Sequence, residues 1–195
     1  QAWIISITKT ANRLWKEFPV KNGYKWHRGG KFVKMLNDHF KKINNVSFSF
    51  KQNINDKEEK GKCIIEYPKK IHCLYDNHKK KLLVSNGKNL VIKNQQINQY
   101  YFYPIEKTAL NLILDQDFLI SKIQETKMDL IDNKFYRFKF DENENSISIF
   151  FDRKSLNLIG WQNIDIYQNL VITYLFDLKI NTQLSKNQFK LPSVD

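Results

Sequence analysis

The sequence contains no long apolar run. No stretch approaches the ~18–20 apolar residues that a membrane-spanning helix needs. Residues 1–7 are too short for the apolar region of a signal peptide, and the basic residues Lys9 and Arg13 follow that region instead of preceding it. The first residue is not Met, which we expect of a processed form or a fragment. The sequence alone therefore does not show export.

The local sequence patterns of common enzyme sites are missing as well. There is no HExxH pair, no P-loop, no G-x-S-x-G elbow and no dinucleotide fingerprint. His72 and Cys73 are adjacent in a predicted strand and point to opposite faces, so they cannot bind one ion together. Asp115 and Asp117 are expected to lie in solvent at a helix end. We predict a protein that is not an enzyme and uses no cofactor or metal; because catalytic triads need not be local in sequence, a hydrolase is the remaining enzyme alternative.

Acidic residues are too few to balance the basic ones, since 32 Lys and Arg stand against 20 Asp and Glu and give a net charge of +12. Such a charge attracts polyanions and anionic lipid headgroups. The lysines are scattered along predicted strands and turns, which indicates a compositional drift and not one nucleic-acid site. Residues 100–103 could form a base-stacking platform, but alternate residues of a strand point to opposite faces, so at most half could stack. We therefore expect no nucleic-acid partner, and keep a basic nucleic-acid-binding β module as the less favoured alternative.

Short alternating or apolar runs separated by turn residues make up most of the chain. Its 195 residues, 42 % of them hydrophobic, suit one domain with a sizeable core. Val46, Phe48 and Phe50 alternate with polar residues, which is the pattern of a strand with one apolar face. Pro68 separates two apolar runs and predicts a turn or a strand end. The Asn-Gly pair at residues 86–87 predicts a hairpin, because both turn positions need a positive φ.

The remaining segments predict further strands and short helices. Thr108 is expected to cap the N-terminus of an apolar helix over residues 109–114. Helical spacing of apolar residues predicts a helix over residues 31–44 and another over residues 7–18, within an N-terminal extension of residues 1–30. We expect that extension to be adventitious, and the alternative is a basic amphipathic helix that contacts a membrane or caps a groove. A helical turn is predicted over residues 117–123, and strands over residues 125–131, 135–140, 146–151, 156–166, 170–180 and 189–191.

About ten strands in consecutive hairpins predict a strongly curved antiparallel sheet. A sheet with one apolar face must cover that face. Only the helices over residues 31–44 and 108–114 are available for this, and two short helices fill a curved sheet poorly. We predict one α+β domain over residues 31–195, mainly β, in which an incomplete (half) β-barrel carries helices as a lid over its concave face and leaves apolar space inside.

Several short motifs resemble, in their order, a known family. They are Gly61 with Tyr67-Pro68, Val84-Ser85-Asn86-Gly87 with Leu90, Tyr103-Pro104 with Thr108 and Leu110, and upstream Phe40, Ile43, Val46, Phe48, Phe50 and Gln52. No single motif is specific, but the ordered set resembles the periplasmic carrier family that moves lipoproteins to the outer membrane, the LolA family. The likeness covers residues 31–195.

The resemblance implies a periplasmic carrier that holds the acyl chains of lipoproteins in a hydrophobic cavity. It also implies that cargo arrives from an inner-membrane ABC release complex and leaves to an outer-membrane acceptor lipoprotein, with no nucleotide used by the carrier. We expect a monomer. A related half-barrel module of the acceptor or sensor type, which binds envelope lipid or lipoprotein, is the alternative.

Strand parity and helical spacing predict which residues face the cavity. At each position plain core packing is the alternative, because most inward apolar residues only fill space. The wall is expected to consist of Val46, Phe48, Phe50, Cys63, Ile65, Ile71, Cys73 and Tyr75. The underside of the lid is expected to consist of Leu36, Phe40, Leu110, Ile113 and Leu114.

The two cysteines, Cys63 and Cys73, are each five residues from Pro68. A tight hairpin at that proline places them opposite each other on one face. They form either a cross-strand disulfide, as an oxidising compartment allows, or two small buried thiols.

Tyr67 stands where known members of the resembled family have an arginine that binds the lid. A phenol donates one hydrogen bond, whereas a guanidinium group offers five donors and a fixed charge. We hypothesise that the lid of this protein is held more loosely, or that Lys69 or Lys70 takes over from beyond the turn.

Overall fold

The computed structural model describes residues 30–77, 80–165 and 167–194, and these form one open antiparallel sheet of eleven strands. The strand order is β6-β5-β4-β3-β2-β1-β11-β10-β9-β8-β7. All neighbours are consecutive in sequence except β1 and β11, so two runs of hairpins join in the middle and the sheet does not close. This confirms the predicted half-barrel. The strands are β1 (Asn45–Ile54), β2 (Lys57–Glu66), β3 (Lys70–Tyr75), β4 (Lys81–Asn86), β5 (Asn89–Asn94), β6 (Gln99–Pro104), β7 (Met128–Ile131), β8 (Phe135–Glu142), β9 (Asn145–Asp152), β10 (Leu158–Ile164) and β11 (Leu170–Ile180).

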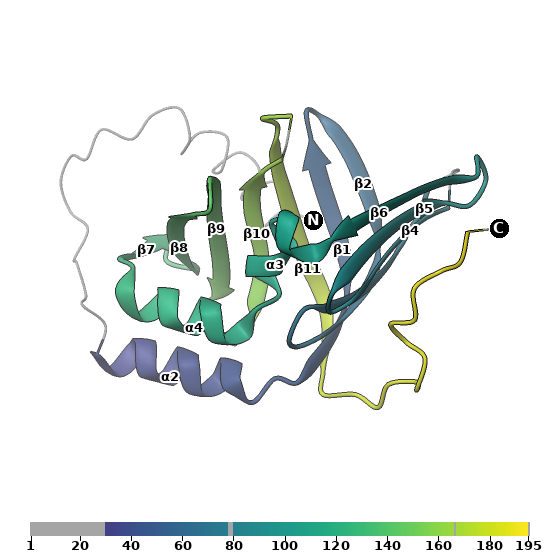
Figure 1. Cartoon of the computed structure of the whole chain (residues 1–195). Helices are drawn as coiled ribbons and strands as arrows, with labels where there is room; N and C mark the ends of the chain where they lie inside the picture. Colours follow the sequence, from purple (N-terminus) through teal and green to yellow (C-terminus); the bar gives the residue numbers. More distant parts are fainter. Residues whose placement is uncertain (1–29, 78–79, 166, 195) are drawn as a thin grey trace.

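Short helices lie on the concave face of this sheet (Figure 1). They are α2 (Gly30–Lys41), the 3-10 turn η1 (Ile105–Lys107), α3 (Leu110–Ile113) and α4 (Gln116–Glu125). Helix α2 packs through aromatic rings, with Phe32 4.0 Å from Tyr136 and Phe40 5.7 Å from Phe151 between ring centroids. Helices α2 and α4 therefore close one end of the half-barrel against β8 and β9.

Alternation along the strands separates two groups of buried apolar residues. On the concave face Phe48 and Phe50 of β1 and Phe138 of β8 belong to the main core, together with the inner faces of α2, α3 and α4. The convex face of β8–β11 carries a second, smaller cluster. Its buried members are Phe135, Phe150, Ile159, Ile172 and Tyr174.

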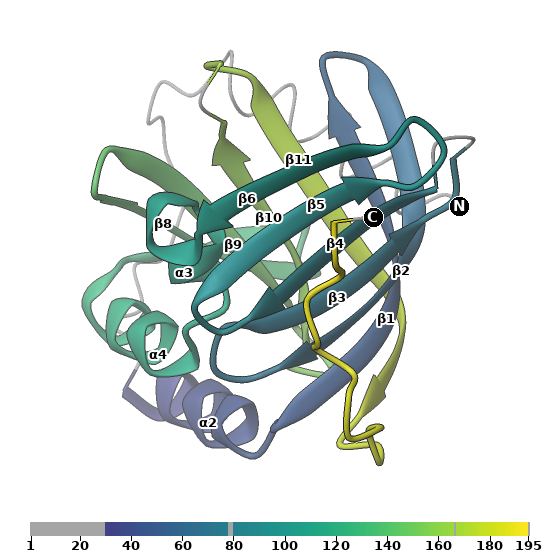
Figure 2. The same cartoon turned by 45° about the vertical axis from the view of Figure 1, so that its right-hand side comes forward.

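The chain after β11 runs across the outside of the sheet, over β3 and β4, and ends beside β5 (Figure 2). The Tyr100 hydroxyl donates to the carbonyl of Pro192 (3.2 Å), and Lys93 Nζ donates to the carbonyl of Ser193 (3.0 Å). The predicted strand over residues 189–191 is wrong, because this segment crosses the strands instead of pairing with them and residues 186–189 form a turn. These two hydrogen bonds tie the C-terminal segment to the convex face of the sheet, near the edge strand β6.

Three other local predictions differ from the structure. The helical turn predicted over residues 117–123 is the ten-residue helix α4, so strand β7 begins only at Met128. Thr108 does not cap α3, since its hydroxyl donates back to the carbonyl of Ile105 (2.8 Å) and closes η1 instead. Asp115 does not point freely into solvent, because it caps α4 by accepting from the amide of Phe118 (3.0 Å). The predicted helix over residues 7–18 lies outside the described residues, and the domain boundary at residue 30 stays a prediction.

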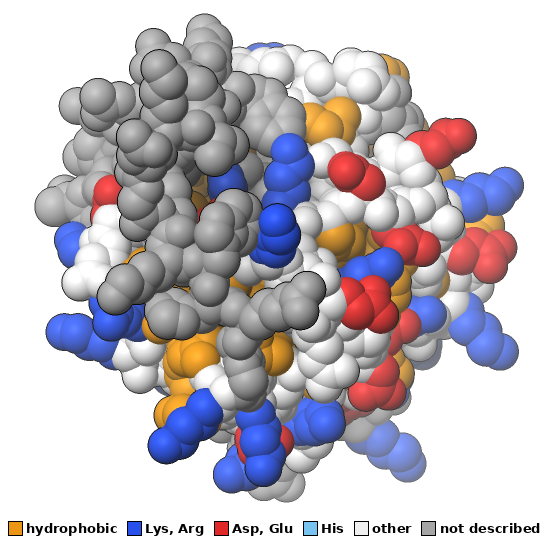
Figure 3. Space-filling view, turned by 90° about the vertical axis from the view of Figure 1, so that its left-hand side faces the viewer, with side chains coloured by type: hydrophobic (Ala, Val, Ile, Leu, Met, Phe, Trp, Pro, Cys, Tyr) orange, Lys and Arg blue, Asp and Glu red, His pale blue; other side chains and the backbone are white. Residues whose placement is uncertain are grey.

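Basic and acidic side chains are interspersed on the visible part of the surface beside α2, α4 and β7 (Figure 3). Most ion pairs are partly exposed, as in Lys122–Glu142 (2.9 Å) and Arg137–Asp129 (2.7 Å). Pairs of this kind contribute little to stability and neutralise the local field. Acidic side chains on this surface therefore offset part of its positive charge.

Candidate ligand cavity

The β2–β3 hairpin forms one wall of the concave face. Pro68 follows a cis peptide bond after Tyr67 and reverses the chain, so Cys63 of β2 pairs with Cys73 of β3. The two sulfurs form a disulfide. Of the two alternatives left open by the sequence, the structure has the cross-strand disulfide, which ties the two strands of this wall together.

A cavity of about 800 Å³ lies between this wall, the strands β4–β6 and the opposite strands β10 and β11. The strand register explains its wall, since one row runs from Phe48 through Cys63, Cys73 and Leu83 to Ile92. This volume lies within the range of about 300–1,000 Å³ that small-molecule sites occupy. Its apolar lining includes Phe48, Phe50, Cys63, Ile71, Cys73, Tyr75, Leu83, Leu90, Ile92, Tyr103, Ala109, Leu110, Ile113, Trp161 and Val171.

Eight of the residues proposed from the sequence lie in that lining, and the other five do not. Val46, Ile65, Leu36, Phe40 and Leu114 belong to the packed core, where α2 and α4 meet the strands. The reason is that α2 sits at the filled end of the half-barrel, away from the cavity. Its side chains cover the core there. The sequence had predicted Leu36 and Phe40 in the underside of the lid, but they do not line the cavity. The eight that line the cavity are Phe48, Phe50, Cys63, Ile71, Cys73, Tyr75, Leu110 and Ile113.

Sequence reasoning missed the cavity residues of the later strands. Leu83 and Ile92 stand in runs that are apolar on both faces, so alternation could not select them. Trp161 and Thr173 reach the cavity only because β11 pairs with β1. That pairing joins the two ends of the chain, and no local pattern encodes it.

Polar groups border the apolar wall of the cavity. Gln52 donates to the hydroxyl of Thr173 (2.9 Å), which links β1 to β11. Lys81 forms an ion pair with Glu59 (2.7 Å) and its Nζ lies 3.9 Å from the ring centroid of Tyr75. Burial, and secondarily the carboxylate of Glu59, raise the pKa of Tyr75 above its usual range. The cavity therefore combines an apolar wall with polar groups, most of which come from the β8–β9 turn and from the region of β10 and β11.

The cavity lid is the segment η1–α3, residues 105–114. Leu110 and Ile113 of this segment face the cavity. The lid is tied to the β2–β3 turn at its end, where the amide of Lys69 donates to the carbonyl of Leu114 (2.8 Å). The Nζ of Lys69 also lies 3.6 Å from the carboxylate of Asp115.

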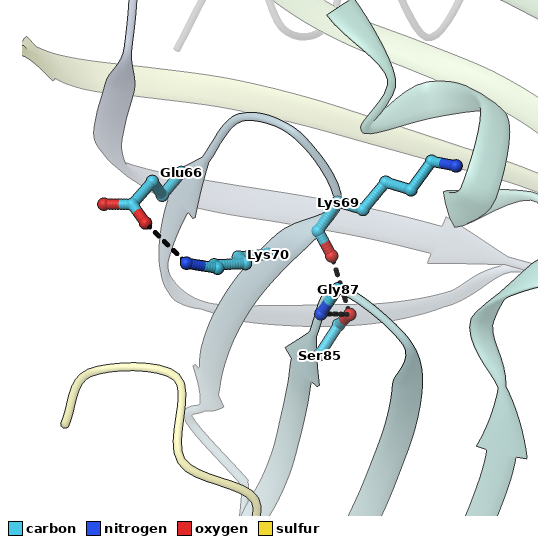
Figure 4. A network of polar contacts seen from close by, with 5 residues as sticks. All are labelled: Glu66, Lys69, Lys70, Ser85 and Gly87. Atoms are coloured by element: carbon cyan, nitrogen blue, oxygen red, sulfur yellow. Dashed lines mark hydrogen bonds and ion pairs between the residues drawn. The ribbon is translucent and has the colours of Figure 1, made fainter.

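A polar network holds the β2–β3 turn in position (Figure 4). The hydroxyl of Ser85 donates to the carbonyl of Lys69 (2.7 Å) and accepts from the amide of Gly87 (3.1 Å). Lys70 pairs with Glu66 within the hairpin (3.0 Å), while the side chain of Lys69 points toward the short helix. Of the two lysines considered for contact with the lid, Lys69 makes that contact and Lys70 does not.

Tyr67 contacts helix α2 through its ring. The ring lies 5.5 Å from that of Phe40 in an edge-to-face arrangement, and the Tyr67 amide donates to the carbonyl of Asn44 (2.9 Å). Burial raises the pKa of the phenol. No hydrogen bond of its hydroxyl to the lid exists among the described residues, so the lid contact at this turn comes from Lys69.

The described residues hold no group of three or more His, Cys, Asp or Glu side chains arranged to bind a metal ion. His39 bonds to Asn157 (2.8 Å), and burial lowers the pKa of His72 on strand β3. Within residues 30–77, 80–165 and 167–194, no helix has the length and apolar character needed to cross a membrane.

Comparison with known proteins gives a family for the chain. The family model for the outer membrane lipoprotein carrier protein LolA matches residues 41–192 of the sequence. No curated protein sequence matches. Among solved structures, an uncharacterized conserved protein from Thermus thermophilus is similar with a TM-score of 0.52 at 9 % identity, covering 85 % of this chain and 96 % of that chain.

Two further solved structures carry related names. A LolA superfamily protein from Nitrosomonas europaea has a TM-score of 0.42 at 6 % identity, covering 81 % of this chain and 97 % of that chain. A putative outer membrane lipoprotein-sorting protein domain from Vibrio parahaemolyticus has a TM-score of 0.43 at 8 % identity, covering 81 % and 95 %. Because the family model spans most of the half-barrel and its lid, the chain belongs to the family of the outer membrane lipoprotein carrier protein LolA.

Proposed function

We propose that this protein is a periplasmic carrier that binds the acyl chains of lipoproteins in the cavity and transfers them from the inner to the outer membrane. The observation that carries the proposal is a cavity of about 800 Å³ with an apolar wall, under a short lid, in a LolA family half-barrel. The apolar lining suits hydrocarbon, and the polar groups near Lys81 and Gln52 suit the ester and amide groups to which acyl chains are attached.

The hydrophobic effect supplies the affinity of such a carrier. Each methylene removed from water contributes about 0.8 kcal/mol, so a long acyl chain left in water is strongly destabilised. The lid residues Leu110 and Ile113 contact the apolar wall when the cavity is empty. Loading must separate part of this apolar surface, which lowers the net affinity and permits release.

Few polar contacts hold the C-terminal end of the lid, which suits a part that opens. Helix α3 has four residues. Its end is held by one backbone hydrogen bond from Lys69 and one partly exposed ion pair to Asp115. Such interactions contribute roughly 0.5–1.5 and 0–1 kcal/mol respectively. Lys69 thus forms a weak latch, two residues from the position where the resembled family uses an arginine.

Partners follow from family membership and are proposed on that basis. We expect cargo from an inner-membrane ABC release complex, delivery to an outer-membrane acceptor lipoprotein and a monomeric carrier. The family model describes carriers, which supports a binding role over catalysis.

A fluorescent fatty-acid probe tests the cavity directly. The wild type should bind the probe saturably and release it when a diacylated lipopeptide is added. Leu83→Trp fills the cavity and should weaken probe binding at least tenfold, whereas Leu74→Trp, at an exposed position on the opposite face of β3, should leave it unchanged. Absence of saturable binding by the folded wild type, or equal loss in both variants, would contradict the proposal.

A further inference from the structure

Strand β6 (Gln99–Pro104) is an unprotected edge of the sheet. Among the described residues it pairs on one side only, with β5, in a regular register without a bulge. None of its six residues is charged, and the exposed fractions of Tyr101, Phe102 and Tyr103 are 43 %, 53 % and 38 %. Natural edge strands usually carry charges or bulges that prevent further pairing. The edge of β6 is therefore chemically ready to accept another strand.

The hydrogen-bonding pattern between β5 and β6 shows which backbone groups of β6 are free to pair with another strand. The amide of Ile105 donates to the carbonyl of Lys88 (2.9 Å), and in an antiparallel ladder such pairs recur at every second residue. The backbones of Tyr103 and Tyr101 therefore form hydrogen bonds with β5. The amide and carbonyl of Phe102, between them, point away from the sheet. Figure 2 shows β6 along the margin of the half-barrel.

The same edge borders the mouth of the cavity. Tyr103 of β6 lines the cavity, and Tyr101 shares its face of the strand by alternation. The opposite lip is formed by the β8–β9 turn at residues 143–146 and by Asp165 and Gln168 between β10 and β11. We expect the part of a bound molecule that protrudes from the cavity to pass between the free edge of β6 and these turns.

We propose that β6 binds the extended polypeptide that follows the acylated N-terminal residue of a cargo lipoprotein, by adding it as a further strand. The proposal rests on the proposed function, because the acyl chains in the cavity bring that segment to the mouth. Backbone pairing to the outward groups of Phe102 is independent of sequence. One carrier can thus hold many different polypeptides, while the exposed aromatic rings cover part of each segment.

The test compares two ligands and two variants. The ligands are a dipalmitoylglyceryl-cysteinyl hexapeptide and the corresponding cysteine amide without a peptide. Phe102→Pro removes the outward amide and leaves the bonds to β5, since edge strands tolerate proline at such positions. Phe102→Val removes the ring and keeps the amide. Each variant is first checked for folding by its binding of the fatty-acid probe, which should match the wild type.

We expect the wild type to bind the lipopeptide about tenfold more tightly than the amide, a difference of ~1.4 kcal/mol. Phe102→Pro should remove this difference and Phe102→Val should keep most of it. In the wild type, hydrogen exchange of the Phe102 amide should slow in the lipopeptide complex and not in the amide complex, and this measurement does not depend on any variant folding.

Equal affinity of the wild type for the two ligands, with an unprotected Phe102 amide, would overturn the proposal and leave the proposed function standing. So would a wild-type dimer that Phe102→Pro dissociates without any change in ligand preference, because the edge would then pair with a second copy. Binding of neither ligand would overturn the proposed function itself.

Discussion

Substitutions of Asp115 distinguish two interactions at the end of the lid, the cap of α4 and the ion pair with Lys69. One carboxylate oxygen accepts from the amide of Phe118 (3.0 Å) and caps α4, and the other lies 3.6 Å from Nζ of Lys69. Asp115→Asn keeps a good capping residue and removes the charge, whereas Asp115→Ala removes both. The pair of variants therefore reports the ion pair and the cap separately.

The structure sets the expected magnitudes. Both side chains of the ion pair are about a third exposed, so its loss should cost about 0–1 kcal/mol and should disappear at high salt. Loss of the cap should add about 1 kcal/mol. If the lid gates release, about 1 kcal/mol corresponds to roughly a fivefold change in rate.

The assay is the release rate of the fatty-acid probe by stopped-flow fluorescence, with hydrogen exchange of residues 110–118 measured in parallel. We expect faster release in the order wild type, Asp115→Asn, Asp115→Ala, with the first step lost at high salt. Lys69→Met should match Asp115→Asn, because it removes the same ion pair. Unchanged release in Asp115→Ala, despite faster exchange of α4, would refute the idea that this attachment gates the cavity.

Further predictions concern the same hairpin. Replacing Cys63 and Cys73 by alanine removes a crosslink that spans ten residues and should lower the free energy of unfolding by about 2–3 kcal/mol in urea titrations; no loss would contradict a bracing role. Tyr67→Arg should slow cargo release by adding donors at the latch position, whereas Tyr67→Phe should leave it unchanged; equal transfer rates in all three proteins would count against the latch. Burial raises the pKa of Tyr67 and Tyr75, so the folded state disfavours tyrosinate. Stability from these groups should be constant below about pH 10 and fall above it, in step with ultraviolet titration of tyrosinate; a normal tyrosinate titration in the folded protein would contradict it.

Local patterns were sufficient for much of the sheet. Val46, Phe48 and Phe50 alternate without exception, and the turn at Pro68 fixes the pairing of Cys63 with Cys73. Each of these features depends on neighbours in sequence or on one tight turn. The half-barrel and one wall of its cavity could therefore be predicted from residues alone.

Local patterns do not predict which residues face the cavity where that depends on tertiary packing. Helix α2 has a clear apolar stripe, yet Leu36 and Phe40 cover the filled end of the half-barrel and not the cavity. Where a helix docks on a curved sheet depends on the sheet's shape, which a helical stripe does not encode. Leu83 stands in a run that is apolar on both faces, so only its pairing with Cys73 shows that it faces inward.

The contact that holds the lid could not be predicted from the sequence, for a different reason. Substitution of the family's arginine by Tyr67 was evident from the sequence, but the contact that takes its place depends on the turn. A positive φ at Lys69 directs its amide to Leu114 and its side chain to Asp115. Ser85 of the neighbouring hairpin holds this turn through the carbonyl of Lys69, a contact that no local sequence pattern encodes.

Native mass spectrometry of the full chain with a purified diacylated lipoprotein tests the carrier function most directly. We predict a one-to-one complex with the acylated form, no complex with the same lipoprotein after its acyl chains are removed, and loss of the complex in Leu83→Trp but not in Leu74→Trp. A folded wild type that forms no complex with the acylated lipoprotein, or that binds both forms equally, would contradict it.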